Sequence, residues 1–239
     1  WVLDKLFSDS ELAKVLLFKG GTSLSKVFGL IERFSEDIDL ILDWRLVTNE
    51  EPTEMRSRTK QDALNKQLDR DSGNYVSGEL RRHIDGLLGN VCSADVDEED
   101  PHKILIRYPR TFPNSYLRPE IVLEVGPLAS WIPHAEYSIR PYAAEQFPSK
   151  FDQTSCRVNA IKAERTFWEK ATILHQEAHR PASKPQPMGY SRHYYDLFCM
   201  MSHSVREVAL AAVQLRQDVV AFKDKFYPRR WARYDLAVP

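Results

Sequence analysis

The hydrophobic pattern divides the chain into a first half with strands and a second half of helices. Short apolar runs predict four strands, at 15–18, 36–42, 103–108 and 121–125. Helical spacing of apolar residues predicts helices at 2–7, 22–30, 75–90, 159–179, 192–203 and 204–226. The strand prediction is strongest where apolar and polar residues alternate, and the helix prediction is strongest at 159–179.

The segments between these elements are polar and read as surface structure. Residues 49–74 predict an exposed helix or an insertion, residues 93–101 an acidic loop, and residues 180–190 a proline-rich loop. We therefore expect an α+β protein in which a small mixed sheet carries the site and a helical lobe closes over it. The expected division is a core at 1–144 and a helical C-terminal lobe at 145–239.

Composition narrows the class of protein. The net charge is −1, which argues against a protein that coats DNA, although a local basic patch beside an acidic site would not show in this sum. The apolar runs are too short to cross a membrane. Three cysteines lie far apart, so we expect neither a disulfide framework nor a zinc site, and the cytoplasm is the expected compartment. Because Trp1 lies inside an expected helix, we expect the natural chain to begin upstream.

Three acidic residues on two expected strands form the main candidate site. Asp37 and Asp39 are two positions apart, so both side chains point to the same face of their strand, while Ile38 and Leu40 point to the other. Glu124 lies within the apolar run at 121–125, where an unpaired carboxylate is unfavourable. Carboxylates held together repel each other unless a cation binds, and Mg²⁺ prefers oxygen ligands. Two aspartates in this spacing are common by chance, so other features must support the site.

A glycine pair before the aspartates is a candidate phosphate site. Gly20 and Gly21 follow an apolar strand and open a helix, where glycine allows close approach and the first N–H groups can bind a phosphate. The hydroxyls of Thr22 and Ser23 point to the same function, and Lys26 lies one turn further on. A plain strand-to-helix turn is the alternative.

Basic residues elsewhere supply possible partners for phosphate. Lys170 lies at the margin of the apolar stripe of helix 159–179, where it reaches either solvent or a cleft. Arg192 and Asp196 are four positions apart, which suits either a surface ion pair or a site in which Arg192 contacts phosphate and Asp196 orients Lys170. Arg33 is expected at the surface, and His175 and His193 as structural or surface residues.

The C-terminal residues 222–234 mix cations with aromatic rings. Cations attract phosphates and aromatic faces stack on unpaired bases, so this stretch is a candidate RNA contact. The alternative is a terminal helix that packs its aromatic rings on the core.

The run at 18–40, FKGGTSLSKVFGLIERFSEDIDL, closely resembles the motif of the AbiEii/AbiGii toxin nucleotidyltransferases. The matching positions are Phe18, Lys19, Gly20, Gly21, Thr22, Ser23, Leu24, Lys26, Arg33, Phe34, Ser35, Asp37, Ile38, Asp39 and Leu40. Weaker similarity continues at 121–129, 163–178 and 191–200, which carry Glu124, Lys170 and Asp196.

This resemblance implies a polymerase β-like nucleotidyltransferase fold and a catalytic set of Asp37, Asp39, Glu124, Lys170 and Asp196. It implies Mg²⁺ or Mn²⁺ at the first three, and an NTP held by the phosphate-binding residues. These are Lys19, Gly20, Gly21, Thr22, Ser23, Lys26 and Arg192.

The implied activity is transfer of a nucleotide to RNA, with the tRNA 3′ end as the expected acceptor. The protein would be a growth-inhibiting toxin of a toxin–antitoxin or phage-defence system, a monomer whose antitoxin need not touch it. A protein or small-molecule acceptor and a non-catalytic nucleotide-binding module stay open as alternatives.

Overall fold

A mixed β-sheet forms the centre of the molecule in the computed structural model, which describes residues 1–35, 37–109 and 120–238. Within these residues the sheet has seven strands in the order β3-β4-β5-β2-β1-β7-β6. Their bounds are β1 Leu16–Lys19, β2 Asp37–Leu42, β3 Ser93–Val96, β4 Lys103–Arg107, β5 Glu120–Gly126, β6 His134–Ile139 and β7 Cys156–Ile161. The pairs β1–β7 and β2–β5 are parallel, and the other neighbours are antiparallel.

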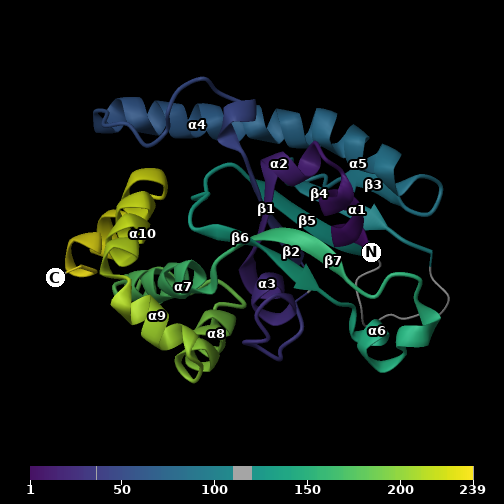
Figure 1. Cartoon of the computed structure of the whole chain (residues 1–239). Helices are drawn as coiled ribbons and strands as arrows, with labels where there is room; N and C mark the ends of the chain where they lie inside the picture. The colour runs from purple at the N-terminus through teal and green to yellow at the C-terminus, as the bar shows by residue number, and fades with distance from the viewer. Residues whose placement is uncertain (36, 110–119, 239) are drawn as a thin grey trace.

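Helices lie on both sides of this sheet (Figure 1). Their bounds are α1 Val2–Ser8, α2 Leu12–Val15, α3 Gly20–Lys26, α4 Arg58–Tyr75, α5 Arg81–Leu88, α6 Tyr142–Gln146, α7 Ala163–Ala178, α8 Ser191–Met201, α9 Val205–Ala211 and α10 Val213–Phe226. A π-helical stretch at Val76–Leu80 joins α4 to α5, so these form one long rod along the top of the molecule in Figure 1. No helix among the described residues has the length and apolarity needed to cross a membrane.

The main core lies between the sheet and the helices α1 and α5. It includes Leu16, Leu40, Leu80, Ile84 and Leu123, each at most 1% exposed. Strand β2 contributes Ile38, Leu40 and Leu42 to this core, while Ile41 packs on the opposite face in a smaller cluster with Leu17 and Ile161. This alternation leaves the opposite face of the first half of β2 to Asp37 and Asp39.

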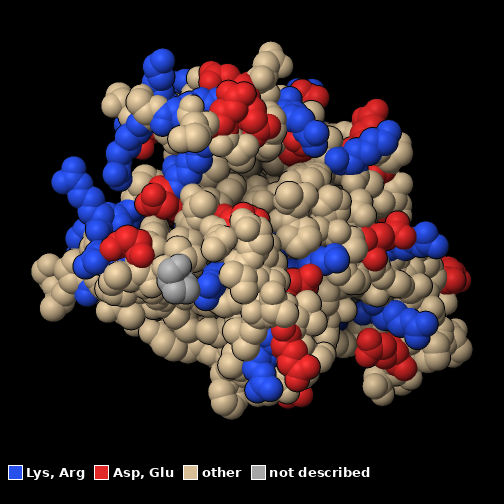
Figure 2. All heavy atoms as spheres, turned by 60° about the vertical axis from the view of Figure 1, so that its left-hand side comes forward, with Lys and Arg blue, Asp and Glu red and all other residues tan. Residues whose placement is uncertain are grey.

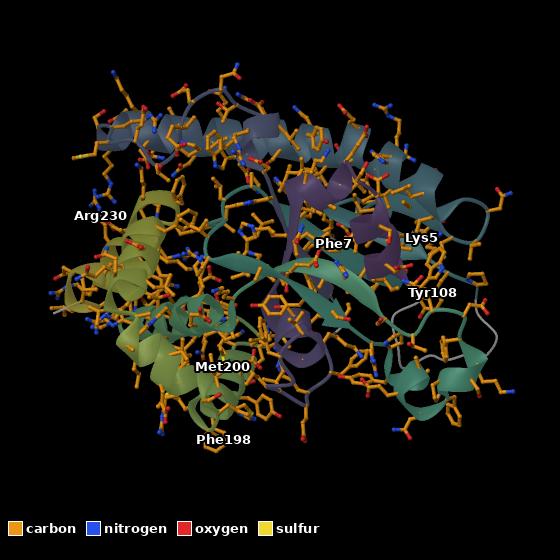
Figure 3. The ribbon with its side chains drawn as sticks, in the orientation of Figure 1. Lys5, Phe7, Tyr108, Phe198, Met200 and Arg230 are labelled. Atoms are coloured by element: carbon orange, nitrogen blue, oxygen red, sulfur yellow. The ribbon has the colours of Figure 1, made fainter. Side chains whose placement is uncertain are left out.

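The helices α7 to α10 form a separate group, in which α7, α8 and α9 pack against α3 and the residues that follow it. Leu24 and Ile31 meet Phe167, Met200 and Ala209 in a second core cluster. Figure 3 shows Met200 directed into this group and Phe198, which is 72% exposed, directed away from it. Because α7 and α8 pack on α3, which directly follows β1, their side chains lie near the end of strand β1.

The predicted combination of a mixed sheet with helices is confirmed, but the sheet is larger than expected. Strand β3 occupies part of the expected acidic loop at 93–101, and residues 159–161 pair within β7 instead of opening the helix. The helix after the glycine pair ends at Lys26, before the expected Leu30. Strand β2 begins at Asp37, because residue 36 of the expected strand lies outside the described residues.

Tertiary pairing explains the missed strand β7. Asn159, Ala160 and Ile161 have no strong strand pattern of their own, but they pair with β6 on one side and contact β1 on the other. The side chain of Asn159 also donates a hydrogen bond to the Ala13 carbonyl, 3.0 Å away. Strand β7 lies within the sheet although it comes after residue 144, where the expected core ends. The division of the chain into a core at 1–144 and a lobe at 145–239 stays a prediction.

Candidate active site

The three predicted acids lie side by side on the parallel strands β2 and β5. Asp39 is in register with Glu124, and Asp37 is in register with Val122. All three carboxylates line one cleft between the sheet and the helices α7, α8 and α10. The described residues that line this cleft are Lys19, Gly20, Gly21, Arg33, Ser35, Asp37, Asp39, Glu124, Thr166, Glu169, Lys170, Ile173, Arg192, His193 and Lys223.

The environment of Asp39 favours its neutral form or a bound cation. Burial raises the pKa of Asp39; Lys19 opposes this, but the negative charges of Glu124 and Asp37 raise it further. The Glu124 carboxylate lies 3.3 Å from the Lys103 ammonium. Among the described residues, no group of three or more acidic, histidine or cysteine side chains converges as a metal site. The acids are therefore neighbours, but Glu124 is bound to Lys103 and not turned to the aspartates.

The glycine pair allows two site residues to approach the backbone closely. Gly20 has φ +81°, and a Cβ atom built there would lie 1.8 Å from Oδ2 of Asp39. A Cβ atom at Gly21 would lie 2.7 Å from Nη2 of Arg33. Only glycine fits at Gly20, since both the positive φ and the space exclude a side chain. The pair thus packs against Asp39 and Arg33, in addition to lining the cleft.

Three residues expected to bind phosphate take other positions. The Thr22 hydroxyl donates to the Asp37 carbonyl at 2.5 Å, and the buried Ser23 hydroxyl donates to the Gly20 carbonyl at 2.9 Å. Lys26 lies over the Tyr142 ring, in a different pocket. In the described part of the chain these three side chains are not part of the cleft wall, so Thr22 and Ser23 fix the turn that presents Asp37.

Asp196 holds two cations behind the cleft. Its side chain is fully buried and accepts hydrogen bonds from Nε and Nη2 of Arg33 at 2.6 and 2.8 Å. The Lys170 ammonium lies 2.7 Å from the same carboxylate. Burial alone would raise the pKa of Asp196, but Arg33 and Lys170 reverse this, and the pKa falls below its ordinary value. Burial lowers the pKa of Lys170, which Asp196 opposes.

These contacts correct two sequence-based expectations. Arg33 is not a solvent-facing surface residue, because it lines the cleft and binds Asp196. Arg192 is exposed on the cleft wall and does not pair with Asp196, although the two are four positions apart. Asp196 contacts Lys170, as expected for a site in which Asp196 orients this lysine. Asp196 itself lies behind the cleft wall.

Three further cations line the cleft around the acids. Lys19, Arg192 and Lys223 line it, and none of them forms an ion pair within the described residues. Burial lowers the pKa of Lys223; Glu169 opposes this, and the nearby Lys19 adds to it. The sequence-based prediction included Lys223 only as part of the basic C-terminal stretch at 222–234. Its spacing from the buried Val219, Val220 and Phe226 was the signal that it lies on the inner face of α10.

His193 and Thr166 add polar groups to the same cleft. Burial, followed by the charges of Lys170 and Arg192, lowers the pKa of His193 to about 4, so its ring is neutral at pH 7. Nδ1 of His193 and Oγ1 of Thr166 are buried and have no hydrogen-bond partner among the described residues. The expectation that His193 is structural or at the surface missed its position on the cleft wall.

The cleft combines acids on the sheet with three cations that form no ion pair among the described residues, an arrangement typical of enzymes that bind phosphate groups. The family to which the chain belongs is more specific. The chain is a member of the AbiEii nucleotidyl transferase toxins of type IV toxin–antitoxin systems, whose sequence pattern matches residues 1–235.

One solved structure is similar to this chain. MenT4, a nucleotidyltransferase toxin from Mycobacterium tuberculosis H37Rv, is similar at 17% identity with a TM-score of 0.48. The match covers 92% of this chain and 63% of that chain, so this chain spans less than two thirds of MenT4. The comparison with curated proteins gave no match.

Nucleotidyl transferases in general use a divalent metal. The residues present fit such a metal in their chemistry. Asp37 and Asp39 offer hard oxygen ligands from one face of β2, and a bound cation would counter the raised pKa of Asp39, which burial and then the charges of Glu124 and Asp37 produce.

Proposed function

We propose that this protein transfers a nucleotide from an NTP to the 3′ end of an RNA, with tRNA as the acceptor and Mg²⁺ or Mn²⁺ as the metal. The observation that supports this most directly is that acidic and basic side chains line the same cleft. Asp37 and Asp39 lie on the sheet wall, and Lys19, Arg192 and Lys223 lie around them without ion pairs among the described residues.

In the proposed reaction the acceptor hydroxyl oxygen forms a bond to the α-phosphorus of the NTP. The bond from this phosphorus to the bridging oxygen breaks, pyrophosphate leaves, and the hydroxyl proton passes to solvent. Lys19, Arg192 and Lys223 would bind the triphosphate and the leaving pyrophosphate, because all three are cations on the cleft wall. Lys170 faces the same cleft while its contact with Asp196 fixes its position.

Asp37 and Asp39 would hold the metal, and Glu124 would join them by turning away from Lys103. When bound, a divalent cation neutralises the carboxylates and stabilises charge on the phosphoryl oxygens. The buried ion pairs of Asp196 keep Arg33 and Ser35 beside the aspartates, so these residues position the site.

We propose that this reaction inhibits growth, as part of a toxin–antitoxin system that acts in phage defence. The protein would act in the cytoplasm as a monomer, and its antitoxin would neutralise it without direct contact. Family membership supports the toxin role, and the composition of the chain supports the proposed compartment.

The test is incubation of the purified protein with each labelled NTP, Mg²⁺ and total RNA. We expect label on RNA, concentrated in the tRNA fraction, and loss of at least about 100-fold in rate in Asp37→Asn and Asp39→Asn. The control is Asp152→Asn, an exposed acid far along the chain. Label on protein would transfer the proposal to a protein acceptor. NTP binding without label on any acceptor would refute the transferase.

A further inference from the structure

A second cationic region lies beyond the cleft, at the C-terminal end of the helical group. We call it the Trp231 surface, and it consists of Arg58, Arg180, Lys184, Arg229, Arg230 and Trp231. We infer that it binds a single-stranded segment of the RNA acceptor next to the end that enters the cleft. This inference rests on the proposed RNA acceptor and adds the surface that recognises it.

Three cations surround the ring of Trp231. The guanidinium carbons of Arg180 and Arg229 lie 4.8 and 5.7 Å from the ring centroid, and the Lys184 ammonium lies 5.9 Å from it. The ring is half-buried, so one part packs on the protein and another is accessible. Aromatic rings flanked by cations bind single strands without sequence preference, because bases stack on the ring and phosphates meet the charges.

Most of these charges are available for a polyanion. Arg58, Lys184, Arg229 and Arg230 are exposed and form no ion pair within the part of the chain that the structure describes. Figure 2 shows Lys and Arg side chains gathered on this side of the molecule, although the whole chain has a net charge of −1. Among the acids nearby, Glu177 binds Arg180 of this surface and Asp235 binds Arg233, which leaves Asp224.

A groove adjoins the Trp231 ring through Arg229, which lines the groove and also lies near the ring. Arg58 from the start of α4 and Arg229 and Arg230 from the segment after α10 line it together. In Figure 3 the labelled Arg230 lies between α4 and α10. The groove is therefore bounded by cations from parts of the chain about 170 positions apart in sequence, an arrangement that depends on the fold.

The helices α7 and α10 line the cleft, and the segments that follow them carry most of the Trp231 surface. Ile173 of α7 lines the cleft, this helix ends five residues later at Ala178, about 7.5 Å along its axis, and Arg180 follows just after its end. Lys223 of α10 also lines the cleft, and Arg229 follows just after that helix ends. Arg229 is near enough to contribute to the lowered pKa of Lys223. An RNA end bound in the cleft thus reaches the Trp231 surface within a few nucleotides.

The experiment measures binding of a labelled RNA hairpin with a single-stranded 3′ extension, in EDTA and without NTP. The test variant is Arg229→Ala/Arg230→Ala, since exposed side chains without ion pairs can be removed while the fold is kept. The control is Arg82→Ala/Arg157→Ala, which removes two exposed arginines from elsewhere on the molecule. Trp231→Ala, with Trp231→Phe as its aromatic control, tests stacking.

We expect Arg229→Ala/Arg230→Ala to weaken binding about tenfold at 0.1 M salt and to reduce the slope of log affinity against log salt by about 1 to 1.5. Trp231→Phe should bind more tightly than Trp231→Ala. Equal affinities for the Arg229→Ala/Arg230→Ala and control variants would overturn the inference, as would equal binding of a blunt hairpin. Because the assay needs neither metal nor NTP, RNA binding without transfer would refute the proposed function alone.

Discussion

Replacing Gly20 with alanine is the sharpest test of how the turn positions Asp39. The new Cβ would lie 1.8 Å from Oδ2, 2.6 Å from Cγ and 2.9 Å from Cβ of Asp39. Rotating the carboxylate does not relieve the last of these, because Cβ is fixed to the backbone of β2. Contacts below 3.0 Å essentially never occur at real Cβ atoms, so the Asp39 carboxylate oxygen must move by about 1.2 Å, the difference between 3.0 and 1.8 Å, and its Cβ by about 0.1 Å, the difference between 3.0 and 2.9 Å.

The expected loss follows from this displacement. A shift of about 1 Å in a catalytic group typically lowers activity about 100-fold, so we expect at least this loss in the rate of labelling. The positive φ of +81° adds about 1–2 kcal/mol of backbone strain to the folded state. The measurements are the transfer rate at saturating NTP and the free energy of unfolding in urea.

Gly29→Ala provides a matched control. Gly29 also has a positive φ, +61°, but a Cβ there would meet nothing within 4 Å. It should therefore lose a similar amount of stability and keep its activity. If Gly20→Ala labels RNA as fast as Gly29→Ala, then Gly20 is not needed for the position of Asp39, and the reasoning about this turn is wrong.

Three further predictions concern the cleft. Asp196→Ala should lower the free energy of unfolding by about 3–5 kcal/mol in urea, because it leaves Arg33 and Lys170 without their carboxylate, whereas Asp235→Ala should change it little. His193 takes up a proton near pH 6.5 in the unfolded state and only near pH 4 in the folded state. As pH falls from 6.5 to 4, protonation of the unfolded state should therefore destabilise the protein progressively. The loss should be at most about 3 kcal/mol and absent in His193→Gln, as measured by urea unfolding across this range. Lys223→Met should raise KM for NTP about tenfold while kcat changes less, and an unchanged KM would remove Lys223 from the triphosphate site.

The acidic wall of the cleft could be predicted from sequence because it depends on a local rule. Side chains alternate along a strand, so Asp37 and Asp39 share a face wherever β2 lies in the sheet. Glu124 followed from the same rule, since its strand is apolar on both sides of it. The parallel pairing that sets Glu124 beside Asp39 is a tertiary fact, but two buried strands from one sheet left few alternatives.

The buried ion pairs of Asp196 behind the cleft could not be predicted, because they join distant parts of the chain. Helical spacing favoured a pair between Arg192 and Asp196, yet Arg33 binds Asp196 from 163 positions away. A fully buried carboxylate needs the closest cations that the fold supplies, and these come from the loop before β2 and from α7. Strand β6 escaped prediction for another reason: it lies at the sheet edge and buries only Ile139, so it has no apolar run.

The charges of the cleft explain why the acids and their cations must be considered together. Asp39 lies in register with Lys19 on one side and with Glu124 on the other, so it has a cation and an anion as direct neighbours. Glu124 in turn binds Lys103 from β4, which lies on the side away from β2. A cation that recruits Glu124 must therefore compete with Lys103, whereas one held by Asp37 and Asp39 need not. Because burial, and then the charges of Glu124 and Asp37, raise the pKa of Asp39, a positive charge that enters the cleft stabilises the ionised form of Asp39. Binding of a metal and ionisation of Asp39 thus reinforce each other, and the triphosphate, which brings negative charge back, is balanced by Lys19, Arg192 and Lys223.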